Sequence, residues 1–372
     1  MKILILSWKD IKNPLSGGAE IFTDELIKKL VTKNYQVTLL TSKFRGSLDK
    51  EIINNYQVIR VGNRWTVYTK AFNYYIKYLS GKFDLVIDQI NTIPFFAKFY
   101  VKEKNILLIH QLCREVWFYE IFFPLNLAGY LIEPFYLRLL KDKQVVTVSE
   151  STKKDLLKYG FDNKKIYIIS EGISIKPLEK LPLVEQIKES NPTILFLGNI
   201  RPMKRLEHII KSFELAKKEI KNLNFWIVGV GKDRYFEKIM RLIKNSIYKN
   251  DITYFGKVNN EEKMRLLQKA HLLCVTSVKE GWGLVVTEAN SQGTPAIVYN
   301  VDGLKDSVKN NETGIICEKN TPEDLAENII KLLKDKERYE ILRKNSWEWS
   351  KEINFEKSLK DFEKIIYQIM KN

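Results

Sequence analysis

The amino-acid sequence predicts an α/β fold of two doubly wound domains, each with a parallel sheet between two layers of helices. The chain has 372 residues, which is too many for one ordinary hydrophobic core. Short runs rich in Ile and Val alternate with longer amphipathic segments, as strands alternate with helices in such folds. This alternation occurs twice, once on each side of the proline-containing segment Ile175–Pro192, which we interpret as an interdomain linker.

The runs assigned to strands are continuously apolar, which indicates strands that are covered on both faces. In the first half of the chain they are Ile3–Leu6, Val37–Thr41, Val58–Val61, Leu85–Asp88, Ile106–His110, Val145–Val148 and Ile166–Ile169. In the second half they are Thr193–Leu197, Phe225–Gly229, Ile252–Phe255, Leu272–Thr276, Ala296–Tyr299 and Gly314–Cys317. Apolar stripes with helical spacing lie between them, for example from Ala19 to Leu30. The chain after Pro322 is predicted to be wholly helical, with a last helix that begins at about Phe355.

The predicted domains are residues 1–175 together with the C-terminal helix 354–372, and residues 176–353. In open α/β sheets, ligands bind outside the carboxyl ends of the strands. Two such domains that face each other would form a cleft. The loops at these strand ends are therefore the candidates for chemistry.

The composition indicates a globular protein of a reducing compartment. Hydrophobic residues make up 45% of the chain and charged residues 28%, unlike a disordered protein. The run Ile3–Leu6 is too short for a secretory signal, and the three scattered cysteines lack the spacing of a zinc site or a disulfide framework. We therefore expect a cytoplasmic location and small buried cysteines.

The net charge of +16 has three interpretations: a nucleic acid, an anionic membrane surface or an anionic small substrate. Basic residues are spread along the chain with acidic residues between them, which argues against a dedicated nucleic-acid groove. A compositional bias of the genome would give the same excess of lysine.

Paired glycines follow the first predicted strand, in the segment Ser16–Glu20. Backbone N–H groups at Gly17 and Gly18 could approach an anion at the start of the first helix. An ordinary helix-entry turn would have the same sequence.

A second loop, Asn199–Arg205, follows the strand that ends at Leu197 and carries Arg201, Lys204 and Arg205. Arginine forks and a lysine charge at the carboxyl end of a strand could clamp a diphosphate. The alternative is a solvated loop in a basic protein.

A third loop carries two carboxylates around a pair of glycines, in the segment Glu280–Asn290. A helix is predicted to begin near Leu284 and to end at Gly293 and Pro295. Glu280 and Glu288 would then offer carboxylates to sugar hydroxyls, with free N–H groups between them for phosphate. The spacing of the two glutamates alone would arise by chance.

The segment Glu280–Ala289 resembles the E-G-[FW]-G-L-x-x-x-E-A signature of the retaining glycosyltransferases of family 4, which have the GT-B fold of two Rossmann-like domains and a facing cleft. Further similar motifs occur in the family's order. They are Gly17–Glu20, Val148–Ser151, Glu171–Ile173, Val228–Gly231 and Val301–Val308.

The resemblance implies a role for each matched residue. Glu280 would bind hydroxyls of the transferred sugar, Glu288 the ribose diol and Lys204 the diphosphate, and His110 would face the donor sugar. Glu280, His110 and Lys204 form the predicted catalytic set. Backbone amides would bind sugar and phosphate at Gly281, Trp282, Gly283, Leu284 and Val285.

One position departs from the family pattern, because Gly198 is followed by Asn199 where the family usually has arginine. Arg201 or Arg205 could supply the missing guanidinium, or the diphosphate could depend mainly on Lys204. His208 and His271 match no family position and are interpreted as structural.

The resemblance further implies transfer of a hexose, with retention, from UDP-glucose or GDP-mannose to a glycan or lipid-linked acceptor. No cofactor and no metal are expected, and no DxD pair follows a predicted strand. The alternatives are an epimerase or a phosphorylase of the same architecture, and a non-catalytic module that binds membrane or nucleic acid through its positive charge.

The segment Trp117–Leu140 is dense in aromatic and aliphatic residues but is interrupted by Glu120, Pro124 and Glu133. A bilayer span needs about 20 apolar residues, so this segment cannot cross a membrane. An interfacial element on an anionic membrane is one hypothesis. A buried helix pair of the first domain is the alternative.

Overall fold

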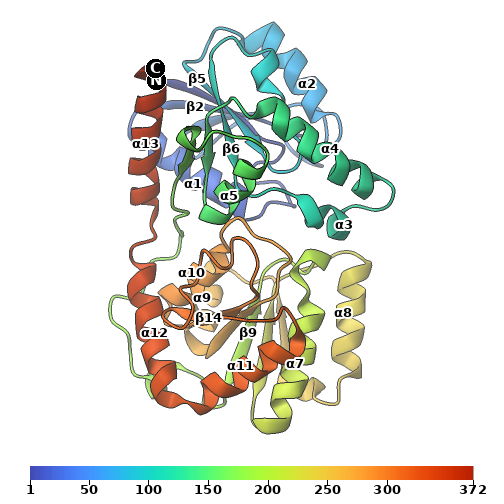
Figure 1. Ribbon diagram of the computed structural model, residues 1–372, viewed down its shortest axis with the longest axis vertical. Coiled ribbons are helices and arrows are strands. Elements are labelled where there is room, and N and C mark those ends of the chain that lie inside the picture. The colour runs from blue at the N-terminus through green and yellow to red at the C-terminus, as the bar shows by residue number, and fades with distance from the viewer. Residues whose placement is uncertain (372) are drawn as a thin grey trace. The chain divides into compact units, whose positions relative to one another are not determined.

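The computed structural model describes residues 1–371, which form two compact units (Figure 1). The N-terminal unit contains Met1–Arg114, Leu127–Ser174 and the chain from Asn354 onward. The C-terminal unit contains Ile175–Ile353 and also Glu115–Asn126. This last segment is the one clear difference from the predicted division, because its residues contact the C-terminal unit although they lie within the first half of the sequence.

The N-terminal unit has an eight-stranded sheet with the order β3-β4-β2-β1-β5-β6-β7-β8. The strands are β1 Lys2–Leu6, β2 Gln36–Thr41, β3 Lys50–Ile53, β4 Tyr56–Arg60, β5 Leu85–Ile90, β6 Lys104–Ile109, β7 Val145–Thr147 and β8 Ile166–Ile168. All neighbours are parallel except β3 and β4, which pair antiparallel. The predicted strands of this half are confirmed, and β3 is an additional edge strand that the sequence pattern missed.

Helices cover both faces of this sheet (Figure 1). They are α1 Gly18–Thr32, α2 Val67–Tyr74 with a π-helical extension Tyr75–Leu79, α4 Leu125–Leu140, α5 Glu150–Lys158 and α13 Phe355–Lys371. The predicted stripe of α1 is confirmed, since Phe22, Leu26 and Leu30 are buried. The Phe22 ring contacts Phe355, which packs the C-terminal helix against the N-terminal unit.

The C-terminal unit has a six-stranded, wholly parallel sheet with the order β11-β10-β9-β12-β13-β14. The strands are β9 Thr193–Leu197, β10 Asn224–Val228, β11 Ile252–Gly256, β12 Leu272–Val275, β13 Ala296–Val298 and β14 Gly314–Ile316. The helices are α3 Trp117–Glu120, α6 Val184–Ile187, α7 Leu206–Glu219, α8 Arg234–Asn245, α9 Asn260–Lys269, α10 Leu284–Ser291, α11 Pro322–Lys334 and α12 Lys336–Ser350. Short 3₁₀ turns in the two units are Ala97–Phe99, Arg114–Val116, Asn163–Lys165, Pro202–Lys204 and Lys249–Asp251.

Strand β9 shows why these strands are continuously apolar. Ile194 and Phe196 belong to one buried cluster with α7 and α11, whereas Leu195 belongs to another with α9 and α10. Alternate side chains of a strand point to opposite faces, so a strand with helices on both faces needs apolar residues throughout. The doubly wound prediction is confirmed.

The segment Trp117–Leu140 is not a buried helix pair. Phe122 and Phe123 have 69% and 74% of their surface exposed, and several side chains of α4 are also exposed. The structure therefore contradicts the buried alternative. Within residues 1–371, no helix is both long and apolar enough to cross a membrane.

Candidate active site

Three loops of the C-terminal unit meet at the carboxyl edge of its sheet, because β10, β9 and β12 are neighbours. They follow the ends of these strands and contain Gly229–Gly231, Gly198–Arg205 and Ser277–Gly283. The amide of Ile200 donates to the carbonyl of Val230 at 2.8 Å, and the amide of Val278 donates to that of Met203 at 2.8 Å. The strand order therefore brings together two of the loops that the sequence indicated.

An ion pair between Lys204 and Glu280 lies at the centre of this edge. The Lys204 Nζ contacts Glu280 Oε1, and the Ser277 hydroxyl donates to the same oxygen at 2.6 Å. Each side chain of the pair has 15% of its surface exposed. A cation and a carboxylate from two different loops are thus held together where solvent still reaches part of each side chain.

The electrostatic surroundings keep Glu280 ionised. Burial by itself would raise the pKa of this carboxyl group. The charge of Lys204, hydrogen bonds from Lys204 and Ser277, and the charge of Arg201 outweigh burial, so that the pKa lies below its ordinary value of 4.5.

Helix α10 begins at Leu284, directly after this loop, as the sequence predicts. Gly283 before it has a φ of 94°, which favours glycine, and Gly293 with a φ of 73° follows its end. Across the loop, a Cβ on Gly303 would lie 2.2 Å from the carbonyl oxygen of Glu280. Close packing of backbone against backbone therefore fixes the Glu280 loop, and the first amides of α10 point out of the helix at its start.

Glu288 lies in the second turn of α10 and pairs with Lys263 of α9 at 2.9 Å. Its side chain has 14% of its surface exposed. The neighbouring Trp282 ring donates through Nε1 to the Thr287 hydroxyl at 3.0 Å. The sequence analysis missed Lys263, because nothing in a pattern of residues shows which lysine of another helix reaches a given carboxylate.

The two arginines of the Asn199–Arg205 loop have different environments. Arg205 donates to the carbonyl oxygens of Thr276 at 2.8 Å and of Ser277 at 2.9 Å, and its guanidinium lies 5.0 Å from the Tyr299 ring centre. Its fork therefore ties the β9 loop to the β12 loop.

Arg201 keeps 43% of its side chain exposed and lies 3.7 Å from Glu120 of α3. Asn199 is exposed as well. Of the two substitutes considered for the missing family arginine, Arg205 already ties two of its N–H groups to carbonyl oxygens, whereas the described contacts of Arg201 are with the Glu120 carboxylate.

His110 lies in the N-terminal unit, where it follows β6 and is buried. Its Nδ1 is 2.7 Å from Glu171 Oε1, its Nε2 is 3.5 Å from the Gln89 side-chain nitrogen, and the Phe22 ring packs edge-on against it. Glu171 is a partner that the sequence analysis did not identify, although it stands in a matched family motif.

At the start of α1, the amide of Gly17 already has a partner within the protein. Glu20 accepts from the Gly17 amide at 2.7 Å, and it is also contacted by Lys9 at 3.2 Å and by Asn91 at 3.0 Å. This is a capping arrangement at a helix start. A phosphate there would compete with the Glu20 carboxylate, so the donor-binding role of Gly17 and Gly18 stays a prediction.

The two other histidines have structural partners, as expected. His208 Nδ1 is 3.0 Å from the Tyr299 hydroxyl, and His271 Nδ1 accepts from the Thr193 amide at 3.1 Å. Burial, with smaller contributions from Lys188 and Arg343, lowers the pKa of His271 to about 3. The three cysteines are buried. Residues 1–371 contain no group of three or more His, Cys, Asp or Glu side chains that could hold a metal ion.

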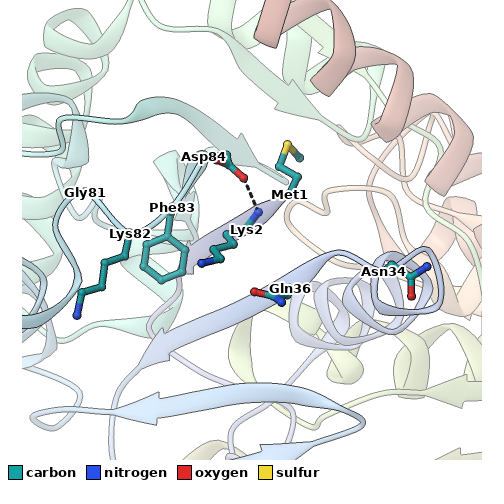
Figure 2. Close-up of a pocket in the computed structure, with 8 residues that line it drawn as sticks. All are labelled: Met1, Lys2, Asn34, Gln36, Gly81, Lys82, Phe83 and Asp84. Atoms are coloured by element: carbon teal, nitrogen blue, oxygen red, sulfur yellow. Dashed lines mark hydrogen bonds between the residues drawn. The ribbon is translucent and has the colours of Figure 1, made fainter.

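A cavity of about 620 Å³ lies at the edge of the N-terminal sheet where the strands begin (Figure 2). It is lined by Met1, Lys2, Asn34, Gln36, Gly81, Lys82, Phe83 and Asp84. These residues stand at or before the amino ends of β1, β2 and β5. Ligands of open α/β sheets bind at the carboxyl ends of the strands, so we do not include this cavity in the candidate active site.

Two doubly wound sheets, with a charged pair and a helix start at the carboxyl edge of one, have the architecture of the GT-B fold. Residues 16–176 match the model of the family Glycosyltransferase Family 4, and residues 178–349 match that of Glycosyl transferases group 1. The chain belongs to the group 1 glycosyltransferases, which transfer a sugar from a nucleotide sugar.

Three known proteins illustrate the similarity. N-acetyl-alpha-D-glucosaminyl L-malate synthase of Bacillus anthracis is 26% identical over 96% of both chains. The structure of sucrose-phosphate synthase from Thermosynechococcus elongatus has a TM-score of 0.79 at 19% identity, covering 99% of this chain and 98% of that one. The structure of Anabaena HepE in complex with UDP-glucose has a TM-score of 0.75 at 16% identity, covering 99% of this chain and 100% of that one.

Proposed function

We propose that this glycosyltransferase moves a hexose, with retention of configuration and without a metal or cofactor, from UDP-glucose or GDP-mannose to a glycan or lipid-linked acceptor. The observation that carries the proposal is the pairing of Lys204 with Glu280 beside the start of α10. Together they place a cation, a carboxylate and unpaired amides at the carboxyl edge of one sheet, where a nucleotide sugar needs all three.

The positive groups would act on the diphosphate. When the bond to the sugar breaks, negative charge develops on the departing phosphate, and oriented cations and amides stabilise it. Lys204, Arg201 and the first amides of α10 are the groups on this edge that can do so, with Arg201 in place of the arginine missing at Asn199. The bound HepE structure supports a uridine nucleotide as one candidate donor.

The carboxylates would grip the carbohydrate. Glu280 stays ionised and accepts only from Lys204 and Ser277 in the described contacts, so its second oxygen can accept from a sugar hydroxyl. Glu288 would bind the ribose diol once its contact with Lys263 yields. The amides from Gly281 to Val285 would bind sugar and phosphate.

No covalent nucleophile is assigned. In the proposed front-face transfer, the bond between the anomeric carbon and the phosphate oxygen breaks as the acceptor oxygen bonds to the same face of that carbon. The acceptor proton passes to the leaving phosphate. His110, whose ring is held by Glu171, is proposed to face the donor sugar.

A donor panel with matched variants tests the proposal. Thermal shifts with UDP-glucose, GDP-mannose and UDP-N-acetylglucosamine should identify one donor, and Lys204→Met should lose that shift. Lys211→Met is the control, since Lys211 forms an exposed pair with Glu323 on the same unit. The anomeric configuration of the product, read by NMR in the presence of EDTA, tests retention and metal independence. An inverted product would contradict retention, and a loss of turnover in EDTA would contradict metal independence.

The rival functions give other results in the same assays. An epimerase would convert the nucleotide sugar without any acceptor. A non-catalytic basic module would still bind membrane or nucleic acid as the Glu280→Ala variant, and the wild type would show no turnover.

We further propose that the enzyme is cytoplasmic and attaches peripherally to an anionic membrane surface.

A further inference from the structure

Helix α4 presents an apolar face to the outside of the N-terminal unit. This α4 face is formed by side chains that recur every three or four residues and are all exposed: Ala128, Leu131, Ile132, Phe135 and Leu139. Leu131 and Phe135 each have 64% of their surface exposed, and Ile132 has 56%. Single exposed leucines are ordinary, but a continuous row along one helix face is not.

Helix α4 differs from an ordinary surface helix because its exposed face is apolar as well as its buried face, where Tyr136, Leu137 and Leu140 pack in the core. Its glutamate, Glu133, is buried and accepts from the amides of Cys113 and Arg114, each at 2.7 Å. The Tyr136 hydroxyl also points inward and donates to the Thr92 carbonyl at 2.6 Å. A helix that buries its carboxylate and exposes an apolar face is suited to an apolar medium outside the protein.

The apolar surface continues into the neighbouring loop. Lys98 Nζ donates to the Leu139 carbonyl at 2.7 Å, and the next residue, Phe99, has 60% of its surface exposed. In sequence, Phe122 and Phe123 precede the helix directly and are more exposed still. Aromatic rings beside the exposed apolar face of a helix are typical of elements that lie in a membrane interface.

Positive charge accompanies this face. Arg138 is exposed on α4 and Lys141 is exposed directly after it, while the nearby Asp142 pairs with Lys98. The N-terminal unit has 30 lysines and arginines against 18 aspartates and glutamates, so it carries +12 of the net charge of +16. Basic groups next to an apolar helix are attracted to the negative surface of anionic lipids.

We propose that the α4 face docks in the plane of an anionic lipid bilayer, with the apolar side chains in the interface and Arg138 and Lys141 at the headgroups. At 16 residues α4 is about 24 Å long, and its buried side packs on the unit, so it lies on the membrane and does not cross it. A lipid-linked acceptor could reach the enzyme from this membrane surface; this last step rests on the proposed function.

Sedimentation with vesicles tests the docking. The full chain should bind vesicles that contain phosphatidylglycerol at low salt, bind less at high salt, and bind weakly to pure phosphatidylcholine. The double variant Leu131→Ser, Phe135→Ser should lose binding by roughly 10- to 100-fold, because each apolar side chain adds to the partition. Arg138→Gln with Lys141→Gln should weaken binding to the anionic vesicles alone.

Matched variants make the test specific. Ile52→Ser with Ile247→Ser removes two apolar residues that are at least as exposed but belong to other elements, β3 and the segment after α8, and this variant should bind like the wild type. Lys204→Met should also bind vesicles normally while it loses turnover, so failure of the docking and failure of the proposed function are separate results. The proposal is overturned if the wild type stays in the supernatant. It is equally overturned if both double variants bind alike, or if light scattering shows that the α4 face instead joins two copies of the chain.

Discussion

Removing one member of the Lys204–Glu280 pair should cost more than removing one member of a surface pair. Loss of a partner in a fully buried pair costs about 3–5 kcal/mol, and exposed pairs are worth about 0–1 kcal/mol. Lys204 and Glu280 each keep 15% exposure, and Ser277 still donates to the carboxylate. We therefore expect Lys204→Met to lower the free energy of unfolding by about 2 kcal/mol.

A double-mutant cycle measures the coupling directly. Lys204→Met, Glu280→Gln and the combined variant are unfolded in urea at pH 7, and a coupling of about 1–2 kcal/mol is expected. Because the two units need not unfold together, the unfolding is followed by tryptophan fluorescence. Five of the seven tryptophans belong to the C-terminal unit.

The control cycle uses Lys211→Met and Glu323→Gln, whose side chains are 58% and 59% exposed. Its coupling should stay below about 0.5 kcal/mol. In turnover assays Lys204→Met should lose on the order of 100-fold or more in kcat/KM, and Lys211→Met should not change. Equal coupling in the two cycles would refute the inference that partial burial strengthens the site pair.

Three further predictions concern groups that support the two sheets. Burial raises the pKa of Asp88 to about 6 from 3.8, against the effect of its backbone hydrogen bonds. The folded state then holds the proton more tightly than the unfolded state, so the unfolding free energy falls by about 2 kcal/mol as pH rises from 4 to 6. Asp88→Asn should remove this slope in urea titrations at successive pH values, and a difference between the two proteins that does not vary with pH would contradict it. Gly303→Ala should destabilise by about 2 kcal/mol, measured as a lower urea midpoint, because its φ is 81° and its Cβ would strike the Glu280 carbonyl. Glu171→Gln should lower turnover and change the ring tautomer of His110, because an amide can donate to Nδ1 where a carboxylate only accepts. Nitrogen NMR spectra report the tautomer, and an unchanged tautomer would show that Glu171 does not orient the ring.

The fold was predictable because its signals are local. A strand that is covered on both faces must be apolar at every position, and such runs mark β1 and β9 without any knowledge of their neighbours. The start of α10 at Leu284 and its end before Gly293 follow from the same local chemistry. Strand β3 escaped because it is short and lies at an edge, with a burial pattern that is mostly exposed.

The sequence by itself determined the two-sheet architecture, the loops that carry charge and the family motif around Glu280, since each depends on residues that are close along the chain. Tertiary structure alone decided the partners. It pairs Lys204 with Glu280 across 76 positions and His110 with Glu171 across 61, and it commits the Arg205 fork to carbonyl oxygens while Arg201 stays exposed. It also left Leu131, Phe135 and Leu139 of α4 exposed. These outcomes depend on which strands are neighbours and which helix face meets the sheet, and both are set by packing between segments that are far apart in sequence.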